Sequence, residues 1–358
     1  MRKIIFNSVL IAALFLSANL FAEDVKFSTG TYQEILDLAK SGNKTIMIDF
    51  ITDWCKWCVE TDRKVYTDPK VSSYANENQI NWKIDAEKGE GPELAKKYGV
   101  KGYPTIIFTN SSGDEIDRIY GYLPADIFLT RMMDYNNGVN TYGDLKNKLE
   151  TSPDDPELNY LMAEKISSNG LDGDVKVYLN KTISADPGNL KGYTDDAKFM
   201  LAYMNEDAAE LQRLIGEYPE SNKVKDGYMN LASYYEDKND PVKADELFSK
   251  AFSVFGENDF DLMQNYGSLL LGRAYGTMKN ENAADKDREN ALITLEKSIK
   301  YVGGTVNEAS AYYIMSELYL QLKDIKKAEE SIDKAISIYD KKSYRDQKDK
   351  ITKLRAEK

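Results

Sequence analysis

Two stretches in the second half of the chain repeat one spacing of aromatic, aliphatic and small residues. The intervals are 3, 1, 3, 9, 4 and 3 residues, and they separate Tyr228, Leu231, Ala232, Tyr235, Ala244, Phe248 and Ala251. The same intervals separate Tyr312, Met315, Ser316, Tyr319, Ala328, Ile332 and Ala335. This pattern predicts two antiparallel helices that cross closely at their small residues. Because one such pair buries its apolar face only against a neighbouring pair, the pattern predicts a stacked array.

Further units extend this array, so that we expect about five between residues 156 and 340. One contains Met162, Ala163, Ile166, Val175, Leu179, Thr182 and Pro187; another contains Gly272, Tyr275, Ala291, Leu295 and Ser298, with an insertion around 279–286. Residues 188–219 form a weaker unit. We expect residues 139–155 to be a linker or first helix, residues 341–358 to be a capping helix or tail, and the tyrosines at the repeat positions to fill the core.

The repeat pattern resembles the tetratricopeptide repeat (TPR), whose first helix carries a large, a small and an aromatic residue and whose second helix carries Ala, a large residue and Ala. This resemblance implies a scaffold whose concave surface binds peptides or other proteins. The alternative is that the repeats only dimerise the protein or orient its other domain.

Residues 23–138 show a different pattern, in which short apolar strands alternate with helices. Strands are expected at 45–50, 80–84, 105–108 and 115–120, and helices at 31–40, 56–66, 68–77 and 93–98. The segment Asn110-Ser111-Ser112-Gly113 is typical of a hairpin turn. The pattern therefore predicts a mixed sheet with helices on its faces.

The chain's two cysteines, Cys55 and Cys58, lie three residues apart where the first strand passes into a helix. That spacing places both sulfur atoms on one helical face, close enough to form a disulfide. The helix N-terminus favours a thiolate at Cys55, and Lys56 adds positive charge nearby. Cys55 is thus a candidate nucleophile toward a disulfide, and Cys58 a candidate resolving thiol. An inert structural disulfide and a zinc half-site are the alternatives.

Residues 44–133 resemble the thioredoxin-like family through separated blocks that occur in the family's order. These blocks are Asp49-Phe50, Trp54-Cys55-Lys56-Trp57-Cys58, Val65–Val71, Leu94–Val100, Gly102-Tyr103-Pro104-Thr105 and Asp117–Tyr122. The Val65–Val71 block is most similar to the C-terminal domain of the thiol:disulfide interchange protein DsbD and its single-domain relatives. The combined expectation for the chain is an α/β thioredoxin fold followed by an all-α TPR solenoid.

This resemblance implies roles for individual residues. Cys55 is the nucleophile, Cys58 the resolving thiol, and Asp49 a buried acid that transfers protons for the thiols. Pro104 is a cis-proline beside the disulfide, and Tyr103 presents its backbone to an extended client. Trp54 and Trp57 are candidate client-binding residues. Trp54 shields the site and Trp57 is either a client contact or buried, with simple packing as the alternative for both. An ordinary acid at the strand edge and a plain proline at a strand start are the alternatives for Asp49 and Pro104.

The sequence also departs from the family. Lys56-Trp57 replaces the Gly-Pro of ordinary thioredoxins, and Asn81 occupies the place of a lysine near the buried acid, with Lys83 two residues further along the strand. The charge partner of Asp49 is therefore open. DsbD's membrane-spanning electron-carrying module has no counterpart, so we expect reducing equivalents to come from another protein, either a membrane or a soluble thiol donor.

Composition excludes several kinds of chemistry. The 358 residues include no histidine, which removes histidine metal sites and Ser-His-Asp or Cys-His catalysis. A net charge of −12 argues against a nucleic-acid partner. We expect neither a metal nor a cofactor.

The first 22 residues have the pattern of a secretory signal peptide. Arg2 and Lys3 precede an apolar run from Ser8 to Leu16, and Ala22 precedes Glu23-Asp24. We expect cleavage after Ala22 and a periplasmic or otherwise exported protein. An uncleaved membrane anchor is the alternative, although the run is short for a membrane span.

The resulting hypothesis is an exported thiol:disulfide oxidoreductase whose clients are proteins with disulfides and whose repeats recruit partners. We favour reduction because the nearest resemblance is to a reducing domain. The alternative is a non-catalytic TPR scaffold with a thioredoxin-like docking domain.

Overall fold

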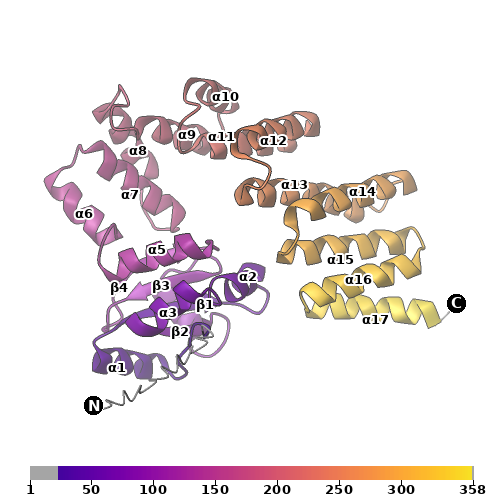
Figure 1. The fold of residues 1–358 in the computed structure, drawn as a ribbon, viewed down its shortest axis with the longest axis horizontal. Coiled ribbons are helices and arrows are strands. Elements are labelled where there is room, and N and C mark those ends of the chain that lie inside the picture. The colour runs from indigo at the N-terminus through magenta and orange to yellow at the C-terminus, as the bar shows by residue number, and fades with distance from the viewer. Residues whose placement is uncertain (1–22, 357–358) are drawn as a thin grey trace, which may run out of the picture.

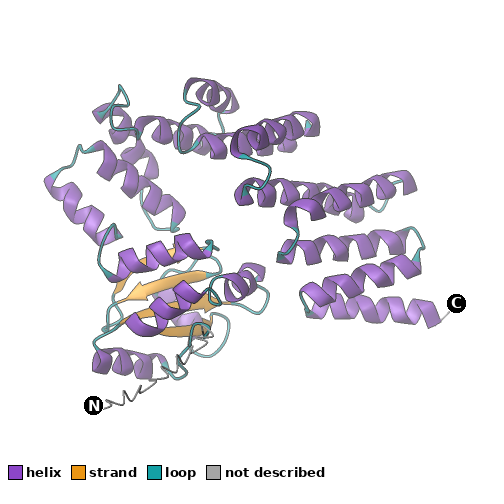
Figure 2. Ribbon diagram, viewed as in Figure 1, coloured by secondary structure: helices purple, strands orange, loops and turns teal. Residues whose placement is uncertain are grey.

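The protein consists of an α/β part followed by a long series of helices, as the sequence predicts (Figures 1 and 2). The computed structural model describes residues 23–356. The predicted signal peptide, residues 1–22, lies outside the described residues. Within residues 23–356, every helix is too short or too polar to cross a membrane.

A four-stranded mixed sheet in the order β2-β1-β3-β4 forms the centre of the α/β part. Its strands are β1 (Thr45–Ile51), β2 (Gln79–Asp85), β3 (Thr105–Thr109) and β4 (Glu115–Tyr120). β1 pairs with β2 in parallel and with β3 antiparallel, and β3 and β4 form the expected hairpin. In the parallel register Asp49 lies opposite Lys83, a pairing that matters for the site.

Helices cover both faces of this sheet because alternate residues of β1 point to opposite sides. Ile46, Ile48 and Phe50 pack with residues of α1 and α4, whereas Met47 packs with residues of α3 and α5. The five helices are α1 (Tyr32–Gly42), α2 (Lys56–Lys64), α3 (Pro69–Asn78), α4 (Gly91–Lys97) and α5 (Ala125–Asn136). α5 was not predicted from the sequence; its Phe128, Met132 and Tyr135 complete the core on the α3 side of the sheet.

The helical part contains the five predicted helix pairs. They are α7 (Pro156–Ser168) with α8 (Val175–Ala185), α9 (Thr194–Met204) with α10 (Ala208–Glu217), α11 (Val224–Asp237) with α12 (Pro241–Phe255), α13 (Phe260–Lys279) with α14 (Asp285–Val302), and α15 (Val306–Gln321) with α16 (Ile325–Ile338). α6 (Tyr142–Thr151) precedes the pairs, and α17 (Lys342–Ala356) packs on α16.

The repeated small residues are buried where helices cross. Ala232 of α11 and Ala244 and Ala251 of α12 are fully buried, with Leu231 and Phe248 in the same cluster. One expectation is wrong: Tyr275, at a repeat position of α13, is 47% exposed rather than part of the core. Residues 279–286, where we expected an insertion, form the last residue of α13, its short connection to α14 and the first two residues of α14.

The helices arch away from one side of the α/β part and return to another (Figure 1). At the first side, Lys165 of α7 and Asn169, the C-cap residue of that helix, contact Asp117 of β4. At the second side, the start of α15 contacts α2, the helix that follows the cysteine motif. The repeats therefore contact the α/β part at both ends of the array.

Candidate active site

The two cysteines lie at the start of α2, directly after the central strand. Cys55 is the N-cap residue of α2, and its sulfur accepts a hydrogen bond from the backbone N–H of Cys58 at 3.0 Å. The two sulfur atoms form a disulfide with an S–S distance of 2.06 Å. Unpaired N–H groups and the helix dipole stabilise negative charge here, so a thiolate at Cys55 is favoured over one in an extended chain.

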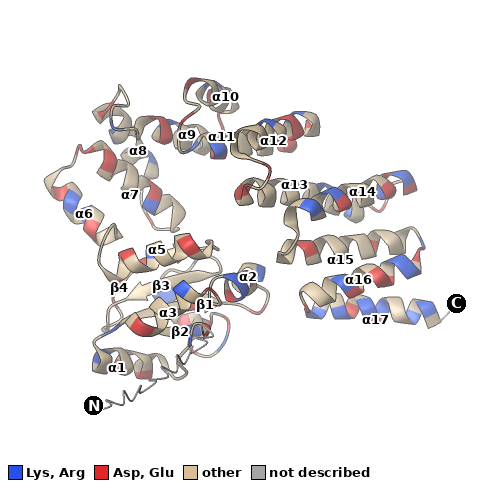
Figure 3. Ribbon diagram, in the orientation of Figure 1, with Lys and Arg blue, Asp and Glu red and all other residues tan. Residues whose placement is uncertain are grey.

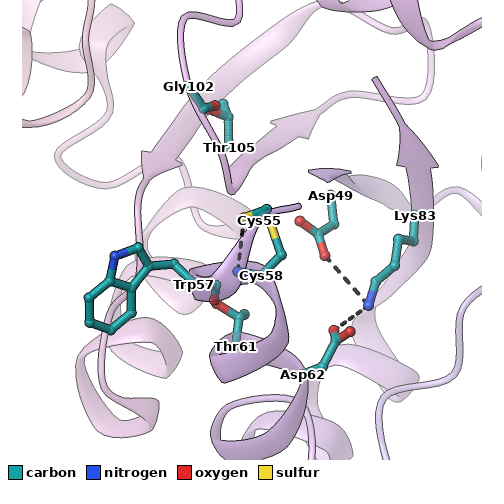
Figure 4. The surroundings of a disulfide bond; sticks show 9 residues. All are labelled: Asp49, Cys55, Trp57, Cys58, Thr61, Asp62, Lys83, Gly102 and Thr105. Atoms are coloured by element: carbon teal, nitrogen blue, oxygen red, sulfur yellow. Dashed lines mark hydrogen bonds and ion pairs between the residues drawn. A yellow bond between two sulfur atoms is a disulfide. The ribbon is translucent and has the colours of Figure 1, made fainter. Parts of the chain in front are cut away.

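Asp49 lies beneath this motif on β1, and its side chain is almost completely buried. Burial raises the pKa of Asp49 to about 7; the positive charge of Lys83 opposes this effect and the negative charge of Asp62 adds to it. One carboxylate oxygen faces Lys83, and the other points toward the side of the disulfide (Figure 4). Within residues 23–356 that second oxygen makes no hydrogen bond of ordinary length, and the Tyr66 hydroxyl near the carboxyl group acts to lower the pKa of Asp49. A carboxyl group with a pKa near neutrality can both accept and donate a proton there.

Lys83 is the charge partner of Asp49 that the sequence left open. Its ammonium lies 3.8 Å from Oδ2 of Asp49 and also pairs with Asp62 of α2. Asn81, by contrast, bonds to Gln79 and to backbone carbonyls away from the acid. The parallel pairing of β1 and β2 causes this arrangement, because it places residue 83 directly opposite residue 49. Asp62 could have been found from the sequence, since it follows Cys58 by four residues on the same helical face.

The loop before β3 forms the next part of the site. The Tyr103–Pro104 peptide bond is cis, as the resemblance implies, and Pro104 is buried while Tyr103 is partly exposed. The Pro104 carbonyl accepts a hydrogen bond from Gly121 at 2.8 Å, and Thr105 Oγ1 donates to the Gly102 carbonyl at 2.7 Å. These bonds fix the loop close to the disulfide (Figure 4).

The two tryptophans of the motif have different surroundings. Trp54 is 65% exposed, makes an edge contact with Tyr103 and donates its indole N–H to Glu87 at 3.0 Å. Trp57 instead stacks on Tyr122, with 5.6 Å between ring centroids. Trp54 and Tyr103 thus form an open aromatic surface, whereas Trp57 is a half-buried residue that packs on Tyr122.

The structure brings all the predicted site residues together around the disulfide. Asp62, Glu87 and Tyr122, and the residues of the repeats that contact α2, also belong to these surroundings and were not predicted from the sequence. No cluster of three or more carboxylate or cysteine side chains suited to a metal occurs in the described part of the chain.

Comparisons with known proteins agree with this geometry. Residues 32–136 match the thioredoxin-like domain, and residues 309–342 match the tetratricopeptide repeat. The thiol:disulfide interchange protein DsbD of Yersinia pestis is 36% identical over 98 residues, covering 26% of this chain and 16% of DsbD. DsbD of Haemophilus influenzae is 30% identical over 115 residues, covering 31% of this chain and 20% of DsbD. The chain therefore spans a fifth or less of the length of these curated relatives.

Two solved structures are similar to different parts of the chain. A Bacteroides thetaiotaomicron protein described as a candidate disulphide-isomerase is 38% identical and covers 32% of this chain and 94% of its own, with a TM-score of 0.30. YrrB, a TPR protein, is 17% identical and covers 56% of this chain and 94% of its own, with a TM-score of 0.35. The N-terminal part of the chain therefore belongs to the thioredoxin-like domain family, and it is followed in the same chain by helical repeats of the tetratricopeptide type.

Proposed function

We propose that the chain is a thiol:disulfide oxidoreductase that acts on protein disulfides. The observation that carries this proposal is the pair Cys55 and Cys58 at the N-terminus of α2, with the buried Asp49 behind them. An inert structural disulfide needs no buried acid with a raised pKa, whereas thiol–disulfide exchange needs a group that moves protons to and from the second thiol.

The proposed reaction begins with the reduced protein. The Cys55 thiolate attacks one sulfur of a client disulfide, which forms a mixed disulfide and releases one client thiolate. Asp49 then accepts the proton of the Cys58 thiol, and the Cys58 thiolate attacks the Cys55 sulfur. The second client thiolate leaves, and the Cys55–Cys58 disulfide forms. Two electrons pass from the protein to the client, and the released thiolates take up two protons.

The surface around Cys55 supports an extended client segment. Trp54 and Tyr103 offer aromatic faces beside the cysteines, and the hydrogen bond that the Pro104 carbonyl accepts from Gly121 holds the loop that carries Tyr103. Aromatic residues of this kind supply large contact area at low entropic cost. We assign client contact to Trp54, Tyr103 and Pro104, and only a packing role to Trp57.

The proposal also covers the direction of electron transfer and the location of the protein. Similarity to DsbD and the signal-peptide pattern of residues 1–22 support an exported reductase, which receives its electrons from a separate membrane or soluble thiol protein. The repeats support recruitment of a partner or client protein. The reduction potential of the Cys55–Cys58 pair distinguishes a reductase from an oxidase. A value near −270 mV, about that of thioredoxin, supports a reductase, and a value near −120 mV, about that of DsbA, supports an oxidase.

The decisive experiment is to trap clients on Cys55. Because the chain has only two cysteines, a Cys58→Ala variant leaves Cys55 as its single thiol and cannot resolve a mixed disulfide. We expect disulfide-linked partners that are released by dithiothreitol, and none with the matched Cys55→Ala variant. Equal trapping by both variants, or none by either, would contradict the proposal. If, in addition, dithiol and disulfide buffers cannot cycle the wild-type pair, the scaffold hypothesis replaces it.

A further inference from the structure

One face of the active-site helix is in contact with the C-terminal repeats. Lys56, Glu60 and Arg63 follow each other at intervals of four and three residues, so their side chains leave α2 on one side. Lys56 bonds to Asn307, Glu60 to the backbone of Val306, and Arg63 to the carbonyl of Ile338. Figure 3 shows α2 as a charge-rich helix next to the start of α15.

Glu60 anchors this contact. Its side chain is fully buried, its Oε2 accepts from the Val306 N–H at 3.3 Å, and its Oε1 lies 2.7 Å from the Lys64 ammonium. Val306 is the first residue of α15, whose terminal N–H groups lack partners within the helix. The carboxylate therefore satisfies a helix N-terminus of the repeats, and the helix dipole favours its charge.

Asn307, the residue of α15 that follows Val306, binds the side chain of Lys56. Its Oδ1 accepts from the Lys56 ammonium at 2.9 Å, and its Nδ2 donates to Ser268 Oγ of α13 at 3.3 Å. The contact to Ser268 orients the amide so that its oxygen, the only atom able to accept from an ammonium, faces Lys56. Asn307 is 1% exposed, so this arrangement is built into the core of the repeats.

Lys56 follows Cys55 directly in the chain and lies, with Trp57, between the two active-site cysteines. A cation near a thiol stabilises the thiolate and lowers the thiol pKa. We propose that Asn307 is a positioning residue for the dithiol: by holding the ammonium of Lys56 beside the motif, the C-terminal repeats stabilise the reduced, thiolate form of Cys55. This inference rests on the proposed function and adds a role for the repeats in setting redox reactivity.

Other charges make the hold on Lys56 necessary. Burial, and secondarily repulsion from Lys341, lower the pKa of Lys56, and the Trp57 ring lies 5.4 Å from its ammonium. Lys341 is itself partly buried near the end of the array, before α17. Lys56 is exposed along part of its length, so without the Asn307 oxygen its ammonium, repelled by a second cation, is favoured to turn out to solvent. Its field at Cys55 then weakens.

The test is a double-mutant cycle on the full-length protein. Asn307→Leu, Lys56→Met and the double variant are compared with wild type, and Asn265→Leu, an exposed asparagine of α13, is the matched control. The thiol pKa of Cys55 comes from the pH dependence of its alkylation by iodoacetamide. The equilibrium constant for reduction comes from glutathione or dithiothreitol buffers, in which the protein disulfide takes up two electrons and two protons.

We expect Asn307→Leu to raise the thiol pKa and to lower the equilibrium constant for reduction about threefold, the size expected for one partly screened charge. Lys56→Met should act in the same direction, and the double variant should equal Lys56→Met. Ser268→Ala, which removes only the partner that orients the amide, should give a smaller shift of the same sign. Asn265→Leu should leave both quantities unchanged.

Two results would overturn the inference. One is a shift by Asn307→Leu that persists in full when Lys56 is already Met, because the effect would then bypass the lysine. The other is an unchanged thiol pKa and equilibrium constant in Asn307→Leu or in Lys56→Met. Failure of the proposed function has a different signature, since the wild-type pair would then not cycle in these buffers at all.

Discussion

The ammonium of Lys165 lies 2.9 Å from Oδ2 of Asp117, and both side chains are buried. Asp117 belongs to β4 of the thioredoxin-like domain, and Lys165 to α7, in the first helix pair of the repeats. The same carboxylate accepts from Asn169 Nδ2 at 3.0 Å and from the Tyr142 N–H at 2.9 Å. A single buried acid therefore joins the sheet to α6 and α7.

The first prediction concerns this ion pair. Lys165→Met leaves the charge of Asp117 buried with only neutral donors, and we expect the free energy of unfolding to fall by about 3 kcal/mol. Urea unfolding followed by circular dichroism measures the loss. Lys148→Met is the matched control, because Lys148 pairs with Asp144 on the exposed surface of α6, where about 0.5 kcal/mol is expected. Equal losses in the two variants would contradict the prediction.

The second prediction concerns the pH dependence of stability. The pKa of Asp49 is raised from 3.8 in its ordinary state to about 7 in the folded protein. Between these values the folded state holds a proton that the unfolded state has lost, so Asp49 makes the wild type less stable as pH rises. In the Asp49→Asn variant, residue 49 does not titrate, so it adds no pH dependence to the free energy of unfolding.

We therefore expect Asp49→Asn to gain stability relative to wild type from about pH 4 to about pH 7, which unfolding at both ends of this range measures. Asp37→Asn, on the exposed face of α1, is the control. A stability difference that does not change with pH would argue against a raised pKa at Asp49.

The third prediction concerns the pH profile of the resolving step. Lys83 is the main group that opposes the effect of burial on the pKa of Asp49. Lys83→Met should raise the pKa of Asp49 further. The pH at which the resolving step becomes fast should then increase by about one unit. The measurement is the rate at which Cys58 releases a small thiol from a preformed mixed disulfide on Cys55. Lys26→Met, an exposed lysine, should leave the profile in place.

The fourth prediction separates the two tryptophans. Trp54→Ala removes an exposed aromatic surface, so kcat/KM for a protein disulfide should fall about fivefold with little change in Tm. Trp57→Ala removes the stacking partner of Tyr122 and should lower Tm. Steady-state kinetics and thermal unfolding test both statements. The reverse pattern would assign client contact to Trp57.

Much of the fold follows from local sequence patterns. Residues 45–51 form a strand buried on both faces because every second residue from Ile46 to Phe50 is apolar and Met47 is apolar as well. The repeat spacing located the helix pairs because their small residues must coincide at the crossings. α5 was not predicted for two reasons. Its apolar residues are interrupted by Thr130 and Arg131, and no side chain caps the N-terminus of the helix.

The site was predictable where it is local and unpredictable where it is not. Cys55, Cys58 and Asp49 lie within ten residues of one another. The pairing of Lys83 with Asp49 could be predicted only from the register of two parallel strands, which no single segment specifies. The contact of Asn307 with the active-site helix depends on the curvature of the whole repeat array. Small rotations between successive helix pairs add up, and their sum places the start of α15 beside α2.

The contact between Lys56 and Asn307 joins groups 251 residues apart in the chain, which has a consequence for biosynthesis. An N-terminal domain folds as soon as its own residues have emerged, at about 5–20 residues per second. The domain that carries Cys55 and Cys58 therefore folds tens of seconds before the asparagine that holds their neighbouring lysine has been made. A chain terminated early would carry the cysteines without that hold, so the mature environment of the dithiol is a property of the finished polypeptide.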